Sequence, residues 1–595
     1  MTTTEATHDT ERRPLLGKTQ STYTDGPVTQ PTAEEYSTDQ GQSKDPLDEA
    51  TRLAALKALP WYRRPSITWI LPFIFLLSIV MGISQAPQEQ LIIRVVCKDH
   101  FKDNDFPSMV QNAASPSGGS CNTPEIQALA ALTMGRIRSL KYLFAIFTIG
   151  YFTSLSDRFG RKPLIFLTLI PVMFTQILIV YMARPTVNLG MWILYLDALF
   201  VGALGGGVLL GPSLNSYVVD CTPREGRSLV MGYVMVSLSL GQIFGPILGG
   251  FLIGLTGDVT SAMTVSIIIQ SVLILYAIIL PESLQKYNKP NVVSNLDTAA
   301  GYSKAEETSF LIKIKNNILV ALDPLLLFLP GKMDTSEDVN VSPSKYTLVT
   351  LIVAYGLLQF ATTGAEVVLI PYTNLAFQWA AVEDGIYLTV QGAASFIVYV
   401  LVFPVLQKLY KRYIEKESPK SSDLSAAATL SSSEIDQHVR DARDAELEAT
   451  EEAILSIKPI EEEVRKKTVW NDLSFFIFGC FIYLISYLLV PLFRMEAVMF
   501  LSCCVRALAS VSIPTFYSLV TSFVPIYQTG KALGGVCVLD TIIMSVSSFL
   551  YGWIFSKTSS TIPSAAYLVC AAFSLLAILT SLTIWSAFRR AEARK

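Results

Sequence analysis

The chain has 595 residues, of which 51% are hydrophobic and only 16% are charged. A soluble domain carries about 25% charged residues, so this composition excludes an ordinary soluble protein and indicates that most of the chain lies in lipid. The formal net charge of −3 carries no information on orientation, because the Lys and Arg content of the short loops sets membrane topology.

Residues 1–60 are rich in Thr, Ser, Asp and Glu, which predicts a disordered tail, and they contain no apolar core typical of a cleavable signal peptide. Within this tail, Glu11-Arg12-Arg13-Pro14-Leu15-Leu16 resembles an acidic dileucine sorting signal, although a chance match explains so short a pattern equally well. The resemblance implies a sorting adaptor that binds Glu11, Leu15 and Leu16. It favours the vacuolar membrane, with the plasma membrane as the alternative.

Twelve apolar segments are long enough to span a bilayer, for which about 20 residues are needed. The chain is therefore predicted to be an all-α membrane protein. The segments are residues 66–86, 134–155, 163–183, 190–218, 228–254, 262–280, 346–370, 385–405, 473–492, 496–520, 532–555 and 564–587. Basic residues gather in alternate loops, whereas the loop 373–384 carries Glu383 and Asp384 and no basic residue, so both termini are predicted to be cytoplasmic.

Three longer connections interrupt the spans. The outer loop 88–130 holds Cys97 and Cys121, which form either a disulfide or two free thiols. Residues 282–345 form a cytoplasmic loop between an amino-terminal half (61–281) and a carboxyl-terminal half (346–590), and contain a short apolar stretch at 317–329. The charged insertion 406–470, with an acidic helical segment at 434–463, is expected to be a solvated spacer or regulatory loop.

The two halves share an internal repeat. Pro212-Ser213-Leu214-Asn215-Ser216 lies eleven residues before Pro223, and Pro514-Thr515-Phe516-Tyr517-Ser518 lies eleven residues before Pro525. The fourth span thus repeats as the tenth, which predicts two pseudo-symmetric six-helix halves with a binding site between them near the bilayer midplane.

A charged stretch between the second and third spans, Asp157-Arg158-Phe159-Gly160-Arg161-Lys162, predicts a tight turn with Gly160 at positive φ. The pattern resembles the signature loop of the major facilitator superfamily, except that Thr153 replaces a usual glycine. The resemblance implies that Asp157 lies beside the start of the eleventh span and that Arg161 pairs with Asp220. This gating loop would latch the cytoplasmic side.

The fifth span carries closely spaced glycines and one proline, namely Gly232, Gly241, Gly245, Pro246, Gly249 and Gly250. Such glycines allow another helix to approach closely, and the proline bends the span. Their spacing resembles the motif of drug/proton antiporters in the same superfamily, where it would shape a seal between the halves. Generic packing of small residues is the alternative.

Charged side chains inside the spans are costly, so each one suggests a function by default. Five are candidates for proton coupling or substrate binding: Asp197, Arg506, Asp540, Lys141 and Glu366. The three histidines, His8, His100 and His438, lie outside the apolar segments, so a carboxylate, Asp197 or Asp540, would carry a proton while Arg506 holds an anionic group. The alternative is a structural ion pair, and it is preferred for Glu366, which is expected near the outer end of its span.

Several further motifs resemble a fungal branch of the superfamily that is related to tetracycline-resistance-type antiporters and to the proton-coupled folate and heme carriers. They are Arg64-Pro65-Ser66, Val96-Cys97-Lys98, Pro281-Glu282-Ser283-Leu284 and Phe377-Gln378-Trp379. The resemblance implies a monomeric, proton-coupled carrier of a small organic solute in the lipid bilayer, with antiport as the leading mode.

Two other functions stay open. One is a proton symporter of an organic anion, suggested by Arg506 and Lys141. The other is a non-transporting receptor or scaffold whose long loops bind a partner. An enzyme, a cofactor, a metal site and nucleic-acid binding are not expected, and the absence of a phosphate-binding P-loop pattern argues against an ATP-driven pump.

Overall fold

The computed structural model of the chain describes residues 60–101, 121–222, 227–283, 346–405 and 447–592, apart from residues 185, 188, 403 and 525–528, together with the isolated residues 325 and 328. All of these belong to one compact unit, residues 50–595. The predicted sorting signal at Glu11, Leu15 and Leu16, most of the apolar stretch 317–329 and residues 406–446 lie outside the described residues.

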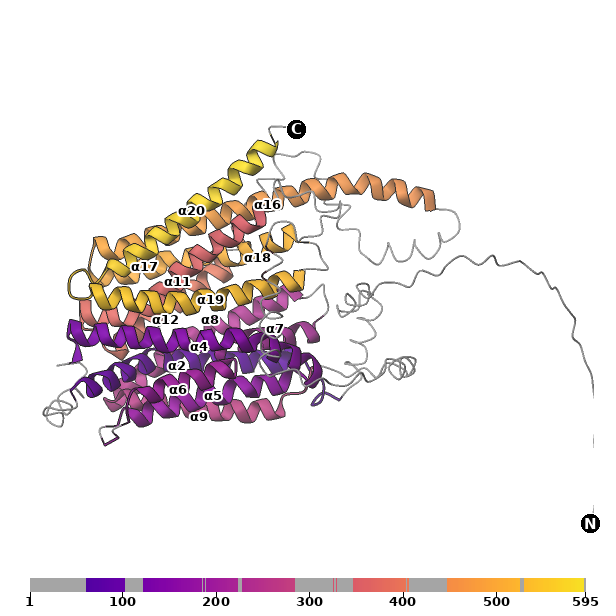
Figure 1. Cartoon of the computed structure of the whole chain (residues 1–595). Coiled ribbons are helices and arrows are strands. Elements are labelled where there is room, and N and C mark those ends of the chain that lie inside the picture. Colours follow the sequence, from indigo (N-terminus) through magenta and orange to yellow (C-terminus); the bar gives the residue numbers. More distant parts are fainter. Residues whose placement is uncertain are drawn as a thin grey trace, which may run out of the picture. The chain divides into compact units, whose positions relative to one another are not determined.

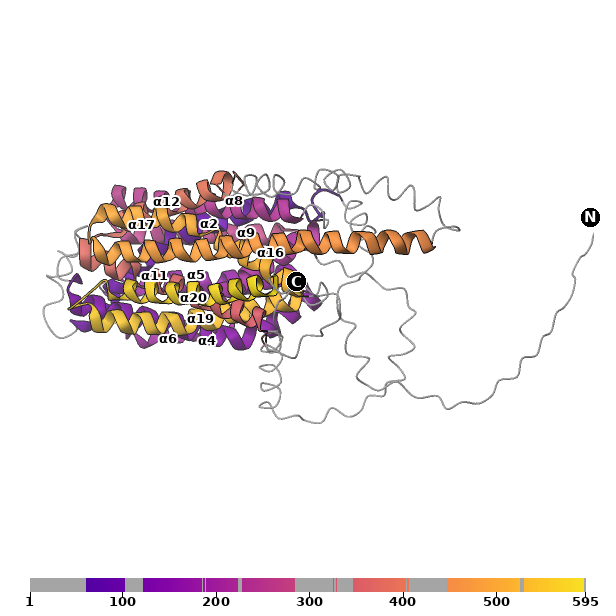
Figure 2. The same ribbon diagram turned by 90° about the horizontal axis from the view of Figure 1, so that it is seen from above.

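The described residues form helices and no strands (Figures 1 and 2). The amino-terminal half contains α2 (Ile67–His100), α4 (Pro124–Phe159), α5 (Arg161–Met182), α6 (Trp192–Ala203), η2 (Gly206–Val208), α7 (Leu210–Cys221), α8 (Arg227–Thr256) and α9 (Val259–Ile279). The carboxyl-terminal half contains α11 (Thr347–Phe377), α12 (Ala381–Ile397), the π-helical turn η4 (Val398–Val402), α16 (Leu447–Leu492), α17 (Glu496–Ala509), α18 (Ser512–Phe523), α19 (Thr529–Thr558) and α20 (Ala565–Glu592).

Eleven helical segments of the described chain are long and apolar enough to cross a membrane, and each matches one of the predicted spans. The twelfth predicted span, 134–155, is part of α4, which is 36 residues long. α4 is not among these eleven segments, and Arg136, Arg138 and Lys141 lie within it. It nevertheless packs lengthwise against α19 (Figure 1). The predicted twelve-helix plan therefore holds, with one charged span.

Several predicted boundaries are wrong because helices continue past them. α2 extends to His100 and α4 begins at Pro124, so much of the predicted loop 88–130 is helical. α16 begins at Leu447, within the acidic segment 434–463 that was predicted to be helical, and runs without a break through the ninth span to Leu492. Figure 1 shows it continuing past the ends of its neighbours. Six of the seven residues at 461–467 are Glu, Arg or Lys, which are good helix formers, so a solvated segment and a span join into one helix.

The internal repeat appears as a break in each of the two repeated spans. Gly205 and Gly206 have positive φ values of 78° and 47° and separate α6 from α7. The corresponding break separates α17 from α18. Pro212 and Pro514 each occupy the third residue after the break. There the missing N–H of proline breaks no helical hydrogen bond, because the first-turn donors of a helix have no partner within it.

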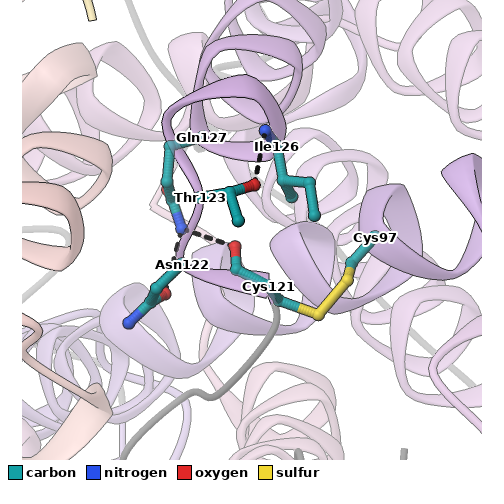
Figure 3. Close-up of a disulfide and its surroundings, with 6 residues drawn as sticks. All are labelled: Cys97, Cys121, Asn122, Thr123, Ile126 and Gln127. Carbon is teal, nitrogen blue, oxygen red and sulfur yellow. Dashed lines mark hydrogen bonds between the residues drawn. A yellow bond between two sulfur atoms is a disulfide. The ribbon is translucent and has the colours of Figure 1, made fainter. Parts of the chain in front are cut away.

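A disulfide between Cys97 and Cys121 joins the end of α2 to the residues just before α4, with a Cα–Cα distance of 5.8 Å (Figure 3). We call this end of the bundle the disulfide end, and the opposite end, at Gly160, the Gly160 end. Several contacts between the halves lie toward the disulfide end. Ser559 Oγ donates to the Pro124 carbonyl at 3.3 Å, and Ser545 Oγ donates to the Ser139 carbonyl at 2.9 Å.

The two largest hydrophobic clusters also differ in whether they join the two halves. One large cluster combines most of the carboxyl-terminal half with residues of the amino-terminal half near the disulfide end, such as Leu91 and Ala131. A second cluster, around Phe73, Leu214 and Tyr217, contains residues of the amino-terminal half alone. The halves therefore share a core at the disulfide end.

Candidate functional site

A cavity of about 420 Å³ lies in the amino-terminal half, between α2, α4, α5 and α6. Apolar side chains line part of its wall, and charged and amide side chains line the rest. Its charged residues are Glu89, Arg138, Lys141, Asp197 and, from α11 of the other half, Glu366. Concave sites with an apolar wall and a few convergent polar groups are typical of small-molecule binding.

Asp197 is buried in this cavity, at 6% exposure, in the second turn of α6. The hydroxyl of Thr175 donates to both carboxylate oxygens, at 3.1 Å and 2.9 Å. Lys141 lines the same cavity, and its positive charge acts on Asp197. The structure thus brings together two of the charged residues singled out in the sequence.

Glu89 is a cavity residue that the sequence analysis missed. It is buried and accepts a charge-assisted hydrogen bond from Arg138 of α4. The predicted first span ended at residue 86, which placed Glu89 in a loop. The apolar run that resumes at Leu91 after Pro87 was the signal that the helix continues.

A second, smaller cavity of about 110 Å³ lies in the carboxyl-terminal half and contains Arg506. The guanidinium of Arg506 donates to the hydroxyl of Tyr387 at 3.1 Å and to Gln391 Oε1 at 3.0 Å. Both of these partners are neutral. A cation held by neutral groups keeps its capacity to bind an anion.

Glu366 lines both cavities. Its side chain is accessible although it lies inside the bundle. The positive charges of Arg506 and Arg138, one from each half, act on its carboxylate. From the sequence, Glu366 was predicted near the end of its span. α11 instead continues to Phe377, so Glu366 lies well inside the helix.

The structure separates Asp540 from the residues of the two cavities. Asp540 lies in α19, where the hydroxyl of Tyr355 donates to its Oδ2 at 3.2 Å. The ring of Tyr355 stacks on Phe516 with 3.7 Å between centroids, which fixes this contact among α11, α18 and α19. Neither cavity includes Asp540 in its wall.

At the other end of the bundle, the predicted turn consists of Gly160 alone, at φ 112°, because α4 continues to Phe159. The side chain of Arg161 donates to Asp220 Oδ2 at 3.2 Å. Glu282 accepts the backbone N–H groups of Arg161 and Lys162, at 2.8 Å and 3.1 Å, and so caps α5. The side chains of Asp157 and Arg158 lie outside the described part of the chain.

The glycines of α8 pack mainly within their own half. Cβ atoms added at Gly241 and Gly245 would meet Ser78 and the backbone of Gly82 in α2, at 2.3 Å and 2.8 Å. Gly249 faces the same helix, whereas Gly250 lies near Val382 of the other half, and Gly232 has open space around it. The close contacts of α8 with the other half depend on glycines of α12 instead. A Cβ at Gly392 would lie 3.0 Å from the Gln242 carbonyl.

The chain matches a known protein family and resembles several membrane proteins. Residues 123–432 match the family model of the Major Facilitator Superfamily. An uncharacterised membrane protein of Schizosaccharomyces pombe is 22% identical over 82% of this chain and 74% of its own length. The tetracycline resistance protein, class B, of Escherichia coli is 23% identical over 46% of this chain and 65% of its own.

Among solved structures, the human organic anion transporter MFSD10 (TETRAN) has the same fold, with a TM-score of 0.51 at 17% identity, covering 88% of this chain and all of that one. The fold, its two repeated halves and the family match all indicate the same superfamily. The chain belongs to the major facilitator superfamily and is a multi-pass membrane transporter.

Proposed function

We propose that this chain is a proton-coupled antiporter of a small organic solute, and that the two cavities together form its binding site. Asp197, Lys141 and the Glu89–Arg138 pair contribute from the amino-terminal half, and Arg506 contributes from the carboxyl-terminal half. Glu366 serves both cavities. Protons would be carried by carboxylates, because the histidines of the chain lie outside the predicted spans.

The observation that carries this proposal is the position of Glu366 in the walls of both cavities. A carboxylate that senses a cation of each half, Arg138 on one side and Arg506 on the other, has two alternative electrostatic partners. When the halves move relative to each other, the distances from the Glu366 carboxylate to the two arginines change. Its affinity for a proton changes with them. That is the linkage a coupled transporter requires.

Orientation and location are also part of the proposal. The Gly160 end, where basic residues gather, and both termini face the cytoplasm. The contacts between the halves at the disulfide end, such as Ser559 with Pro124, would then break when the site opens to the other side. The dileucine pattern at Leu15 and Leu16 favours the vacuolar membrane over the plasma membrane.

Symport of an organic anion with protons is the second candidate. The neutral hydrogen-bond partners of Arg506 favour it, since they leave the guanidinium able to bind a carboxylate of the solute. The two modes differ in the direction in which protons move when solute moves.

The test uses the full chain in sealed liposomes with a pH indicator inside and an imposed pH gradient. A panel of organic cations, anions and neutral solutes is added, with tetracycline included because of the bacterial relative. Antiport predicts that solute accumulates in acidic vesicles while protons leave, and symport predicts that both move together. A panel in which no solute moves protons would contradict both modes.

In the same assay, Glu366→Gln is expected to retain solute exchange while losing dependence on the pH gradient. Glu383→Gln is the matched control, because Glu383 accepts a hydrogen bond from the backbone of Ala380 at the start of its own helix. Unchanged coupling in Glu366→Gln would remove Glu366 from the proton pathway.

A further inference from the structure

A hydrogen-bonded cluster that joins the two halves, away from both cavities, is centred on Asp384 of α12. The Asp384 side chain is only 2% exposed. The amide of Gln90 in α2 donates to its Oδ2 at 3.0 Å, and the hydroxyl oxygen of Thr373 in α11 lies 2.8 Å from its Oδ1. Gln90 belongs to the amino-terminal half, whereas Thr373 and Asp384 belong to the carboxyl-terminal half. Neither cavity includes Asp384 in its wall.

Asp384 has few donors for a buried carboxylate. An ionised carboxylate offers about four acceptor sites, and the two groups that reach it, from Gln90 and Thr373, are both neutral. Among the described residues, Asp384 forms no ion pair with a lysine, an arginine or a histidine. A buried charge is costly unless it is paired and hydrogen-bonded, so these surroundings suit a neutral group.

The charged groups around the cluster do not compensate a negative charge on Asp384. Two acids act on it and repel such a charge, Glu89 of α2 and Glu383 of its own helix. The first turn of α12 favours an anion, but Glu383 already provides one, because its carboxylate accepts the backbone N–H of Ala380 at 2.9 Å. The cations of the neighbouring helices are engaged elsewhere: Arg138 with Glu89, Arg94 with Asp258, and Arg506 with Tyr387 and Gln391.

A proton on Asp384 Oδ1 completes the hydrogen bonds of the cluster. Thr373 Oγ1 also lies 3.1 Å from the Ile370 carbonyl, to which it can donate its single hydrogen. It then accepts a hydrogen from Asp384 Oδ1, while Oδ2 remains a carbonyl oxygen and accepts from Gln90. The second hydrogen of the Gln90 amide is used as well, since Asn374 Oδ1 lies 2.9 Å from the same nitrogen. With Asp384 neutral, each donor from Ile370 to Gln90 has an acceptor.

We propose that Asp384 is a proton-binding site of the closed disulfide end, distinct from the proton-carrying role of Glu366. When the halves separate at this end, Gln90 leaves with α2 and Asp384 meets water, which takes the carboxyl proton. When they close, the carboxylate regains one proton from the water on that side. The closed end therefore holds one proton more than the open end, and acid on that side favours closure. The proposal depends on the halves separating here and on neither antiport nor symport.

The experiment measures the distance between the halves at the disulfide end of the full chain in lipid nanodiscs. Glu125 at the start of α4 and Ser560 just after α19 are exposed positions of different halves. Both are replaced by a spin-labelled unnatural amino acid, so that the native cysteines stay unlabelled. We expect the ratio of closed to open molecules to fall as the pH rises, by up to about tenfold per pH unit, which is the limit for one proton. An ionised Asp384 in the closed end would give the opposite direction.

Variants locate the effect at Asp384. Asp384→Asn imitates the protonated acid, since an amide can donate to Thr373 and accept from Gln90, and it should stay closed without pH dependence between about pH 5 and 8. Glu383→Gln is the matched control, because it removes the neighbouring acid and should keep the pH dependence of the unaltered chain. Thr373→Val removes the acceptor of the carboxyl hydrogen, so it is expected to reduce the dependence on pH.

Infrared difference spectroscopy detects the proton itself. Under acidic conditions, the spectrum of the unaltered chain minus that of Asp384→Asn should contain the C=O stretch of a protonated carboxylic acid. Three results would overturn the proposal: a ratio of closed to open molecules that is constant or rises with pH, an Asp384→Asn variant with the same pH dependence as Glu383→Gln, or no such C=O stretch. These readouts report conformation and protonation without solute flux, so this proposal and the proposed transport function can fail separately.

Discussion

The side-chain amide of Gln90 in α2 donates to Asp384 Oδ2 in α12 at 3.0 Å, which ties the first helix of one half to the second helix of the other. The same nitrogen lies 2.9 Å from Asn374 Oδ1, and Thr373 Oγ1 donates to Asp384 Oδ1 at 2.8 Å. Asp384 is buried, although the sequence analysis placed it in a loop. This cluster lies near the disulfide end, where opening would have to break it.

Gln90→Leu is expected to favour opening at the disulfide end. The change removes both amide hydrogen bonds and leaves two buried oxygens with fewer donors, a cost of about 1–3 kcal/mol to the closed arrangement. We expect faster hydrogen–deuterium exchange over residues 88–98 in nanodiscs, by roughly tenfold. Glu383→Gln, which alters the neighbouring acid, should leave this exchange unaffected. Equal exchange in Gln90→Leu and the unaltered chain would show that the cluster does not hold the halves together.

The two aspartates proposed as proton carriers should differ in their effect on transport. Asp197 lies in the cavity with Thr175 and Lys141, whereas Asp540 lies in α19 and accepts a hydrogen bond from Tyr355 of α11. Asp197→Asn is therefore expected to lower uptake driven by a pH gradient at least roughly tenfold, within the range that general acid–base groups contribute. Asp540→Asn should keep the solute KM unchanged. Uptake assays in liposomes measure the dependence on the pH gradient and the solute KM. Normal coupling in Asp197→Asn would exclude Asp197 as the proton carrier.

Gly160→Ala is expected to destabilise the junction of α4 and α5. Gly160 has φ 112° and ψ 167°, a region that only glycine occupies readily, and an added Cβ would lie 2.5 Å from the Glu282 carboxylate that caps α5. We expect a loss of about 1–3 kcal/mol, seen as a lower midpoint of thermal unfolding in detergent.

Gly257→Ala provides the control for that variant. Gly257 also has positive φ, at 69°, but a Cβ there would meet no atom within 4 Å. It therefore reports the cost of a positive φ without a collision. If Gly160→Ala lowers the unfolding midpoint no more than Gly257→Ala does, the special conformation of Gly160 and its contact with Glu282 add nothing to stability.

Gly245→Ala tests the packing of α8 on α2. The new Cβ would lie 2.7 Å from the Ile79 carbonyl and 2.8 Å from Gly82 Cα, and backbone atoms cannot move aside cheaply. Overpacking of this kind costs about 1–3 kcal/mol. Gly254→Ala, in the same helix with nothing within 4 Å, should be neutral or slightly stabilising. The midpoints of thermal unfolding of the two variants are compared. Similar midpoints would show that Gly245 is not tightly packed against α2.

The sequence by itself determined the membrane class, the twelve spans and the relation between the two halves. These features depend on local properties: the length of apolar runs, the repeated Pro212 and Pro514 segments, and the glycine at position 160. Each of the predicted spans corresponds to a helix or a pair of helices in the structure.

Tertiary structure alone decided which charged residues meet. Glu89 and Asp384 were assigned to loops because helix ends are weakly encoded where apolar runs fade gradually. α2 continues past its predicted end, and α12 begins before its predicted start. Glu366 was expected near a helix end, and Asp540 was expected in the site. Helices that are apolar on most faces do not reveal which face turns inward, and the packing of neighbouring helices fixes that rotation. For this reason the cavities, with Glu366 in both walls, became visible only in the assembled bundle.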